Sequence, residues 1–151
     1  MHESFKKILV TTDFSESGDH AIGHAFRMAA DHGAEVALCH VVEMIVAPNP
    51  LYAQYYPTDL LSPEIRARAE QDAHQALKDR VPKDEALAKV RCTTMVLHGL
   101  PAEEIIRAAD EAKADLIVIG THGRTGLKHL FLGSVAERVI RHVRCPVLVV
   151  R

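Results

Sequence analysis

The chain has 151 residues, of which 48% are hydrophobic and 25% charged, a composition typical of a globular protein with a buried core. This length fits one domain spanning residues 1–151. The formal net charge of −2 gives no basic field for nucleic acid, and no apolar run reaches the ~20 residues needed to cross a bilayer.

The N-terminal residues, MHESFKK, lead into a strand pattern without the apolar segment of a signal peptide. The three cysteines, Cys39, Cys92 and Cys145, are widely spaced and form no CxxC pair. That spacing argues against a disulfide framework and against a zinc ribbon. We therefore expect a cytoplasmic protein without a nucleic-acid or membrane partner.

Five apolar segments are predicted to be β-strands. They are residues 8–10, 36–42, 90–97, 116–119 and 147–150. Three of them are nearly continuous apolar runs, which is typical of strands covered on both faces in a parallel sheet. The segment 90–97 has the most mixed pattern of the five.

Helical patterns fill the intervals between these strands. Ser15 is the predicted N-cap of the first helix and Gly33 its C-terminal stop, while Ser62 and Pro63 are predicted to open the second helix. The predicted buried stripes are Ile22, Ala25, Phe26 and Ala29; Ile65, Ala69, Ala73 and Leu77; Ala102, Ile105, Ile106 and Ala109; and Val135, Val139 and Val143. Regular alternation of strand and helix predicts a single α/β domain with right-handed crossovers.

The segment 43–61 breaks this alternation. It contains three prolines and all three tyrosines of the chain, Tyr52, Tyr55 and Tyr56. A connection of this length in a compact domain is often functional. Two interpretations remain open, a plain surface excursion and a flap whose tyrosines cover a ligand or a partner.

The stretch GTHGRTGLKHLFLGSV, residues 120–135, combines glycines with hydroxyl and basic side chains. It begins at the carboxyl end of a predicted strand and ends at the start of the last predicted helix, where Ser134 follows Gly133. In open parallel sheets, ligands bind at that edge. A helix N-terminus offers unpaired N–H groups to phosphate, and glycine allows close backbone approach. A phosphate-bearing ligand is therefore favoured over a plain basic loop.

The charge count supports an anion site at this end of the chain. Residues 120–145 contain five Lys or Arg against one acid. Neither GxxxxGK(S/T) nor GxGxxG after the first strand is present, which excludes a P-loop and a dinucleotide fingerprint. Asp13, after the first strand, is interpreted either as a cap for the first helix or as a ligand of a ribose hydroxyl or a phosphate-bound cation.

The spacing Gly120-x2-Gly123-x9-Gly133-Ser134 resembles the ATP-binding signature G-2x-G-9x-G-(S/T) of the universal stress protein family. The segments KKILVTTDFSE, LCHVVE, HGLPAEEIIRAADEAKADLIVIGTHGRTGL and GSVAERVIRHVRCPVLVVR resemble the same family. The resemblance spans the whole chain and is weakest over residues 44–90. It implies a Rossmann-like open five-stranded parallel sheet of order 3-2-1-4-5, with helices on both faces.

The resemblance also implies a nucleotide site for ATP, bound with Mg or Mn. The main chain at Val41 would hold adenine, and Thr11, Thr12 and Asp13 would flank the nucleoside. The residues implied to wrap the ribose and phosphates are Gly120, Thr121, His122, Gly123, Arg124, Gly133, Ser134 and Val135.

Three functions remain open at this point: a nucleotide-gated stress regulator, a slow ATPase, and an interaction module without nucleotide. We find no evident base for rapid phosphoryl transfer, so we expect a binding protein without protein catalytic residues, and slow hydrolysis stays open. An uncovered apolar edge strand at residues 147–150 favours pairing with a second copy, and the family resemblance implies the same homodimer.

His20 and His24 lie four residues apart, a spacing that can hold a metal. A solvated helix face is the favoured interpretation of this pair.

Overall fold

The computed structural model of the chain describes residues 4–43, 51, 62–121 and 132–151. The elements in chain order are β1 (Lys7–Thr11), α1 (Glu16–His32), β2 (Glu35–Glu43), α2 (Pro63–Arg80), β3 (Cys92–Gly99), α3 (Pro101–Ala112), β4 (Leu116–Gly120), α4 (Ser134–His142) and β5 (Val147–Val150).

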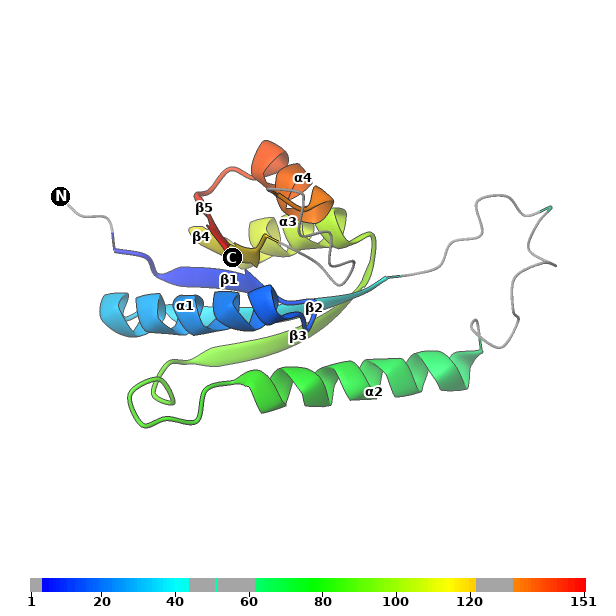
Figure 1. Cartoon of the computed structure of the whole chain (residues 1–151), viewed down its shortest axis with the longest axis horizontal. Helices are drawn as coiled ribbons and strands as arrows, with labels where there is room; N and C mark the ends of the chain where they lie inside the picture. The colour runs from blue at the N-terminus through cyan, green and yellow to red at the C-terminus, as the bar shows by residue number, and fades with distance from the viewer. Residues whose placement is uncertain (1–3, 44–50, 52–61, 122–131) are drawn as a thin grey trace.

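The strands form one sheet in the order β3-β2-β1-β4-β5, with every neighbouring pair parallel (Figure 1). The Rossmann-like order that the family resemblance implies is thereby confirmed. All strands point the same way, so the segments that follow β1, β2, β4 and β5 emerge at one edge, which we call the carboxyl edge.

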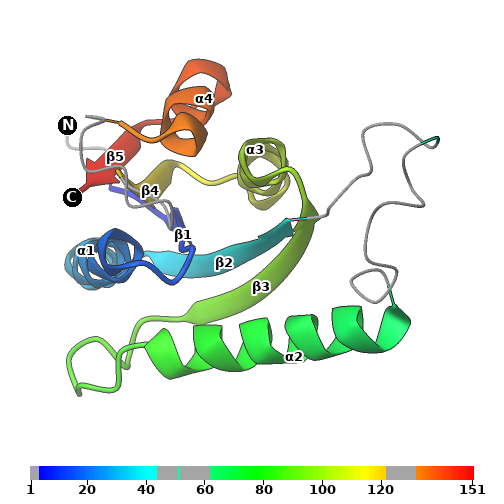
Figure 2. The ribbon, with the colours of Figure 1, turned by 45° about the vertical axis from the view of Figure 1, so that its right-hand side comes forward.

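Helices cover both faces of the sheet, α1 and α2 on one and α3 and α4 on the other (Figure 2). Strand β1 shows why its sequence is continuously apolar. Ile8 and Val10 pack in the cluster under α1 and α2, whereas Leu9 packs in the cluster under α3 and α4. Each successive side chain therefore meets a buried layer.

The predicted helix ends are confirmed where the sequence carried capping residues. The Ser15 side chain accepts from the N–H of Gly18, and Gly33 ends α1 with φ of 68°, a left-handed conformation that glycine adopts without steric cost. Ser62 accepts from the N–H of Ile65 at 3.2 Å, and Pro63 occupies the first turn of α2.

The predicted buried stripe of α2 is wrong in its first half. Ala73 and Leu77 are buried as expected, but Ala69 is exposed and Ile65 is 42% exposed. The first turns of α2 extend past the carboxyl end of β3 in both views (Figures 1 and 2), so they have no sheet to pack against. Periodicity alone does not reveal where a neighbouring strand ends.

Strand β3 begins at Cys92 rather than at residue 90. The N–H of Val90 instead donates to the carbonyl of Leu87 at 3.0 Å, which closes a turn before the strand. The mixed pattern of this strand follows from its position at the sheet edge, where most of its side chains are only partly covered.

Candidate functional site

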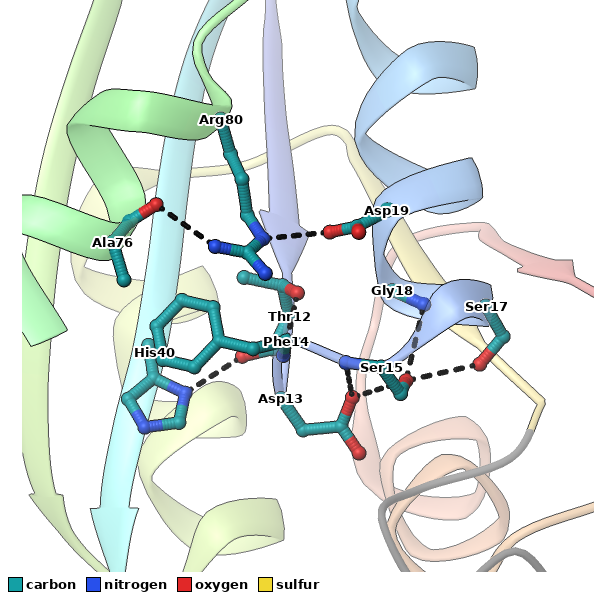
Figure 3. A network of polar contacts seen from close by, with 10 residues as sticks. All are labelled: Thr12, Asp13, Phe14, Ser15, Ser17, Gly18, Asp19, His40, Ala76 and Arg80. Carbon is teal, nitrogen blue, oxygen red and sulfur yellow. Dashed lines mark hydrogen bonds and ion pairs between the residues drawn. The ribbon is translucent and has the colours of Figure 1, made fainter.

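The turn after β1 brings three predicted site residues to the carboxyl edge. Thr11 ends the strand, and the N–H of Thr12 extends the pairing by donating to the carbonyl of Cys39 at 3.0 Å. Both threonines are buried, and Asp13 is half-buried. The Asp13 carboxylate accepts from the N–H of Ser15 at 3.0 Å and from the Ser15 hydroxyl (Figure 3). Asp13 thus supports the cap residue Ser15 instead of capping α1 itself.

The thiol of Cys39 lies beneath this turn. Burial raises the pKa of Cys39 to about 12, and a hydrogen bond with the Thr11 side chain opposes that rise. Burial also raises the pKa of Cys92 and of Cys145, and all three thiols are free. A nucleophilic cysteine needs a lowered pKa, so these thiols have the properties of structural residues.

Phe14 has a main-chain conformation that is unusual for its residue type. Its φ is 66°, and its N–H donates to the Thr12 hydroxyl at 3.0 Å. A left-handed conformation costs a residue with a side chain about 1–2 kcal/mol. The other non-glycine residue with positive φ in the described part of the chain, Lys113, ends helix α3, where that conformation is common. Phe14 has no such context.

Contacts on both sides of the Phe14 ring compensate for this conformation. The His40 ring stacks on Phe14 with centroids 4.2 Å apart, and the Arg80 guanidinium lies 4.7 Å from the Phe14 centroid. Figure 3 shows the ring between these two side chains. Aromatic stacking contributes about 0.5–1.5 kcal/mol and a cation–π contact about 0.5–2 kcal/mol, which is the same order as the conformational cost.

Both partners of Phe14 are themselves held in place. The carbonyl of Thr12 accepts from Nδ1 of the buried His40 at 2.8 Å. Arg80 donates from Nε to Asp19 at 2.7 Å and from Nη1 to the carbonyl of Ala76 at 3.2 Å. These contacts tie β2, α2 and α1 to the turn that carries Asp13.

Val41 lies one residue after His40 in β2. Val41 is 8% exposed, and its side chain packs in the cluster under α3 and α4. Only the main chain of Val41 is therefore left to contact a ligand at the carboxyl edge. Since His40 contacts Thr12, the segment containing Val41 lies beside the turn after β1.

The end of β4 packs directly against the start of α1. A Cβ atom on Gly120 would lie 2.6 Å from Oγ of Ser17, 3.0 Å from the Ser17 carbonyl carbon and 3.1 Å from the N of Gly18. Gly18 is equally tight, since its Cβ would meet the Thr12 hydroxyl at 2.6 Å. Glycine at position 120 therefore has a packing role. From the sequence, this glycine was interpreted only as allowing close approach of a ligand.

The residues on either side of the glycine-rich stretch meet at Thr121. The N–H of this buried residue donates to the carbonyl of Val150 at 2.7 Å, and its carbonyl accepts from the N–H of Gly133 at 2.7 Å. A Cβ atom on Gly133 would lie 2.9 Å from that carbonyl oxygen. Helix α4 therefore starts beside the ends of β4 and β5.

The start of α4 has no side-chain cap from the part of the chain that the structure describes. Gly133 is the N-cap residue, and no side-chain hydrogen bond to the first turn exists among the described residues. Ser134 is exposed, and Val135 is partly buried against the cluster under α3 and α4. The first N–H groups of a helix need acceptors from outside the helix, so this end suits an anionic group.

The charge count from the sequence overstates the local positive field. Arg138 pairs with Glu103 at 3.0 Å and Arg141 with Glu137 at 2.8 Å. Arg144 lines a cavity of about 720 Å³ near the opposite edge, together with Lys6 and Asp115, which precede β1 and β4. The three described cations, Arg138, Arg141 and Arg144, therefore do not converge on one site, and Arg124 and Lys128 lie outside the described residues.

Several predicted residues lie outside the described residues, namely His122, Gly123 and Arg124, together with the loop tyrosines Tyr52, Tyr55 and Tyr56. His20 is described, and its Nδ1 lies 3.0 Å from the carbonyl of Arg151. Within the described ranges, no group of three or more His, Cys, Asp or Glu side chains is arranged to hold a metal ion. In the same ranges, no helix has the length and apolarity that a membrane span requires.

The sequence did not identify four residues that shape this edge: Phe14, Gly18, His40 and Arg80. Phe14 stands in the quoted segment KKILVTTDFSE and Gly18 lies two residues after that segment, but a positive φ and a close packing distance have no pattern in a single sequence. His40 and Arg80 contact the turn only through tertiary structure, so residue spacing could not have identified them.

Comparison with known proteins gives a consistent result over the full length. The model of the "Universal stress protein family" matches residues 4–151. Universal stress protein MJ0531 of Methanocaldococcus jannaschii is 41% identical over 147 residues, which covers 97% of this chain and 82% of that relative.

Two solved structures are similar to the whole fold. The structure of protein MJ0577, from the same organism, superposes with a TM-score of 0.80 at 30% identity, covering 98% of this chain and 96% of that one. A universal stress protein in complex with cAMP superposes with a TM-score of 0.61 at 26% identity, covering 99% of this chain and 98% of that one.

Proposed function

This chain belongs to the universal stress protein family, and from that premise we propose that it binds ATP at the carboxyl edge and acts as a nucleotide-dependent regulatory protein in a stress response. The similar structure solved with cAMP supports an adenine nucleotide as the ligand class.

One observation supports the location more than any other. The uncapped start of α4 lies beside Thr121, at the same edge as the turn carrying Thr12 and Asp13. Donors for phosphate and acceptors for a nucleoside therefore occur on neighbouring strand ends, where ligands of open α/β sheets bind.

Each part of the nucleotide is assigned to a part of the edge. Adenine lies against the main chain at Val41, and Thr11, Thr12 and Asp13 flank the nucleoside. The ribose and phosphates contact the main chain and hydroxyl groups between the end of β4 and the start of α4. Those residues are Gly120, Thr121, His122, Gly123, Arg124, Gly133, Ser134 and Val135.

A divalent cation, Mg²⁺ or Mn²⁺, accompanies the triphosphate. Asp13 is a described carboxylate at this edge, and its Oδ1 already accepts two hydrogen bonds from Ser15. Mg²⁺ commonly binds through substrate phosphates, with one or two carboxylates and waters. The phosphates are therefore its main ligands, and Asp13 acts directly or through a water.

The protein works by binding and not by rapid hydrolysis. Fast hydrolysis needs a positioned water, a base and charge stabilisation at the γ-phosphate. Asp13 and His40, two ionisable side chains described at this edge, form hydrogen bonds that fix the turn after β1. A regulator needs only different affinities of ATP for two conformations. Steady release of phosphate at many turnovers per minute would overturn this part of the proposal.

We further propose a homodimer formed through Val147–Val150. Strand β5 is at one end of the strand order and pairs in the sheet with β4. An antiparallel pairing of two β5 strands would satisfy both edges by two-fold symmetry. Sedimentation equilibrium should give twice the chain mass of 16.7 kDa, and a monomer at micromolar concentration would contradict the pairing.

The free thiols are consistent with a cytoplasmic location.

The test of the nucleotide site begins with the purified full chain. Denaturation should release an adenine nucleotide, identified by mass and ultraviolet spectrum, or the protein should take up ATP with Mg²⁺ by calorimetry. The Ser134→Ala variant should bind less, while Ser4→Ala, at the opposite edge, should bind as the wild type does. A wild-type chain that neither carries nor binds adenine nucleotide would leave the interaction module as the better hypothesis.

A further inference from the structure

We propose that Phe14 is a positioning residue for nucleotide binding, fixed between His40 and Arg80 so that Thr12 and Asp13 keep the geometry that a bound ribose requires. This inference rests on the proposed function. Phe14 itself is not assigned a contact with the nucleotide.

The side chains around the turn point in different directions. In Figure 3 the Phe14 ring points toward His40 and Arg80, whereas the Asp13 carboxylate points away from them. Asp13 and Phe14 are consecutive residues, so rotation of the main chain at Phe14 changes the direction of the Asp13 carboxylate. The φ of 66° at Phe14 is therefore linked to the orientation of Asp13, a residue predicted to contact the nucleoside.

The contacts of the Phe14 ring maintain this φ. A phenylalanine has no intrinsic preference for the left-handed region, and such strain persists only where the surroundings enforce it. The surroundings here are the His40 ring at 4.2 Å and the Arg80 guanidinium at 4.7 Å. His40 also donates to the Thr12 carbonyl at 2.8 Å, so one side chain contacts the turn on both sides of Asp13, at Thr12 and at Phe14.

Arg80 reaches the turn from the end of α2. Its pairing with Asp19 at 2.7 Å joins α2 to α1 across the Phe14 ring. Arg80 also donates to the carbonyl of Ala76 in the last turn of its own helix, which fixes the guanidinium near the ring. Its contacts thus add a third element to the support of the turn, which is how a rigid shell of neighbours orients binding residues.

The chain contains a matched control for this stack. Phe5 packs against His32 with ring centroids 5.2 Å apart and an interplanar angle of 57°. This second Phe–His pair lies at the end of α1 that is far from the turn. Replacing it removes a similar apolar contact and leaves Asp13 untouched.

The experiment compares the wild type with Phe14→Leu, Phe14→Tyr, Arg80→Gln and Phe5→Leu. Calorimetry with Mg²⁺ gives the dissociation constants of ATP and of its 2′,3′-dideoxy analogue, which lacks the ribose hydroxyls. Phe14→Leu should raise the dissociation constant of ATP by about threefold to thirtyfold. It should raise the dissociation constant of the analogue less, so that the preference for ATP over the analogue falls.

The other variants separate positioning from general destabilisation. Phe14→Tyr keeps the ring and should keep the wild-type preference, and Phe5→Leu should not change it. Arg80→Gln removes a partly exposed side chain and should lower the preference for ATP over the analogue by a smaller factor than Phe14→Leu does. This variant still tests the inference if Phe14→Leu does not fold. An unchanged preference in both Phe14→Leu and Arg80→Gln overturns the inference alone. A wild-type chain that binds neither nucleotide overturns the proposed function together with the inference.

Discussion

Helices α1 and α4 both start at the carboxyl edge of the sheet, but their first turns differ in how the backbone donors are satisfied. At α1 the Ser15 side chain accepts from Gly18, and Asp13 in turn accepts from Ser15. At α4 the N-cap is Gly133, without a side-chain bond from the described residues. Within the described residues, one start is thus capped by a side chain, and the other is the start that the proposed function assigns to phosphate.

This difference gives the glycines at the edge two distinct roles. Gly120 allows β4 to approach the closed start of α1, where a Cβ atom would lie 3.0 Å from a backbone carbon. Gly133 removes a capping side chain from the open start of α4. A helix start can therefore stabilise the fold or bind an anion, depending on a few residues before its first turn.

The strongest way to break this comparison is to disturb the contact between β4 and α1. Gly120→Ala places a Cβ atom within 2.6 Å of Ser17 Oγ and close to backbone atoms that cannot rotate away. The free energy of unfolding should fall by about 1–3 kcal/mol, measured by urea unfolding without nucleotide. Gly23→Ala is the control, since its Cβ has only an ordinary contact with Arg27 at 3.7 Å. This helical substitution should stabilise by about 0.5–1 kcal/mol.

A smaller effect is expected from opening the start of α1. Ser15→Ala removes the cap bond to Gly18 and the hydroxyl contact with Asp13, while the main-chain N–H of residue 15 still donates to Asp13. Loss of an N-cap costs about 1 kcal/mol, which the midpoint of urea unfolding should report. An unchanged midpoint would mean that the first turn of α1 does not depend on its cap, and the contrast between the two helices would lose its basis.

The smallest effect on stability is expected at the start of α4. Ser134 is exposed, so Ser134→Ala should change the free energy of unfolding by less than about 0.5 kcal/mol. Its hydroxyl is assigned to a phosphate group, and a hydrogen bond to a charged group is worth roughly tenfold in affinity for ATP. If Ser134→Ala and Ser15→Ala changed stability equally, the two helix starts would be equivalent.

The sequence predicted the fold well where local chemistry decides it. Apolar segments predicted β1, β2, β4 and β5, and Ser15, Gly33 and Ser62 marked helix ends because caps act within one turn. The sequence failed where a distant neighbour decides. Ile65 is exposed because α2 extends past β3, a relation that helical periodicity does not contain.

The candidate site divides in the same way. Asp13 and Ser134 were predicted from their positions after a strand and before a helix, Thr12 was implied by the family resemblance, and the structure describes all three at one edge. The charge count did not carry over, because Arg138 pairs with Glu103 on α3 and Arg144 lies toward the opposite edge. Phe14 was missed because its partners His40 and Arg80 come from other elements.

The most direct test of the account is an amide chemical-shift map of the isotope-labelled chain during titration with ATP and, separately, with adenosine. The account predicts that ATP shifts the amide signals of Ser134, Val135 and Ala136 strongly, that adenosine does not, and that both leave the capped amide of Gly18 nearly unchanged. Phosphate would then bind at the open start of α4. Shifts concentrated at Gly18, or no shift at α4 while ATP binds elsewhere, would contradict the account.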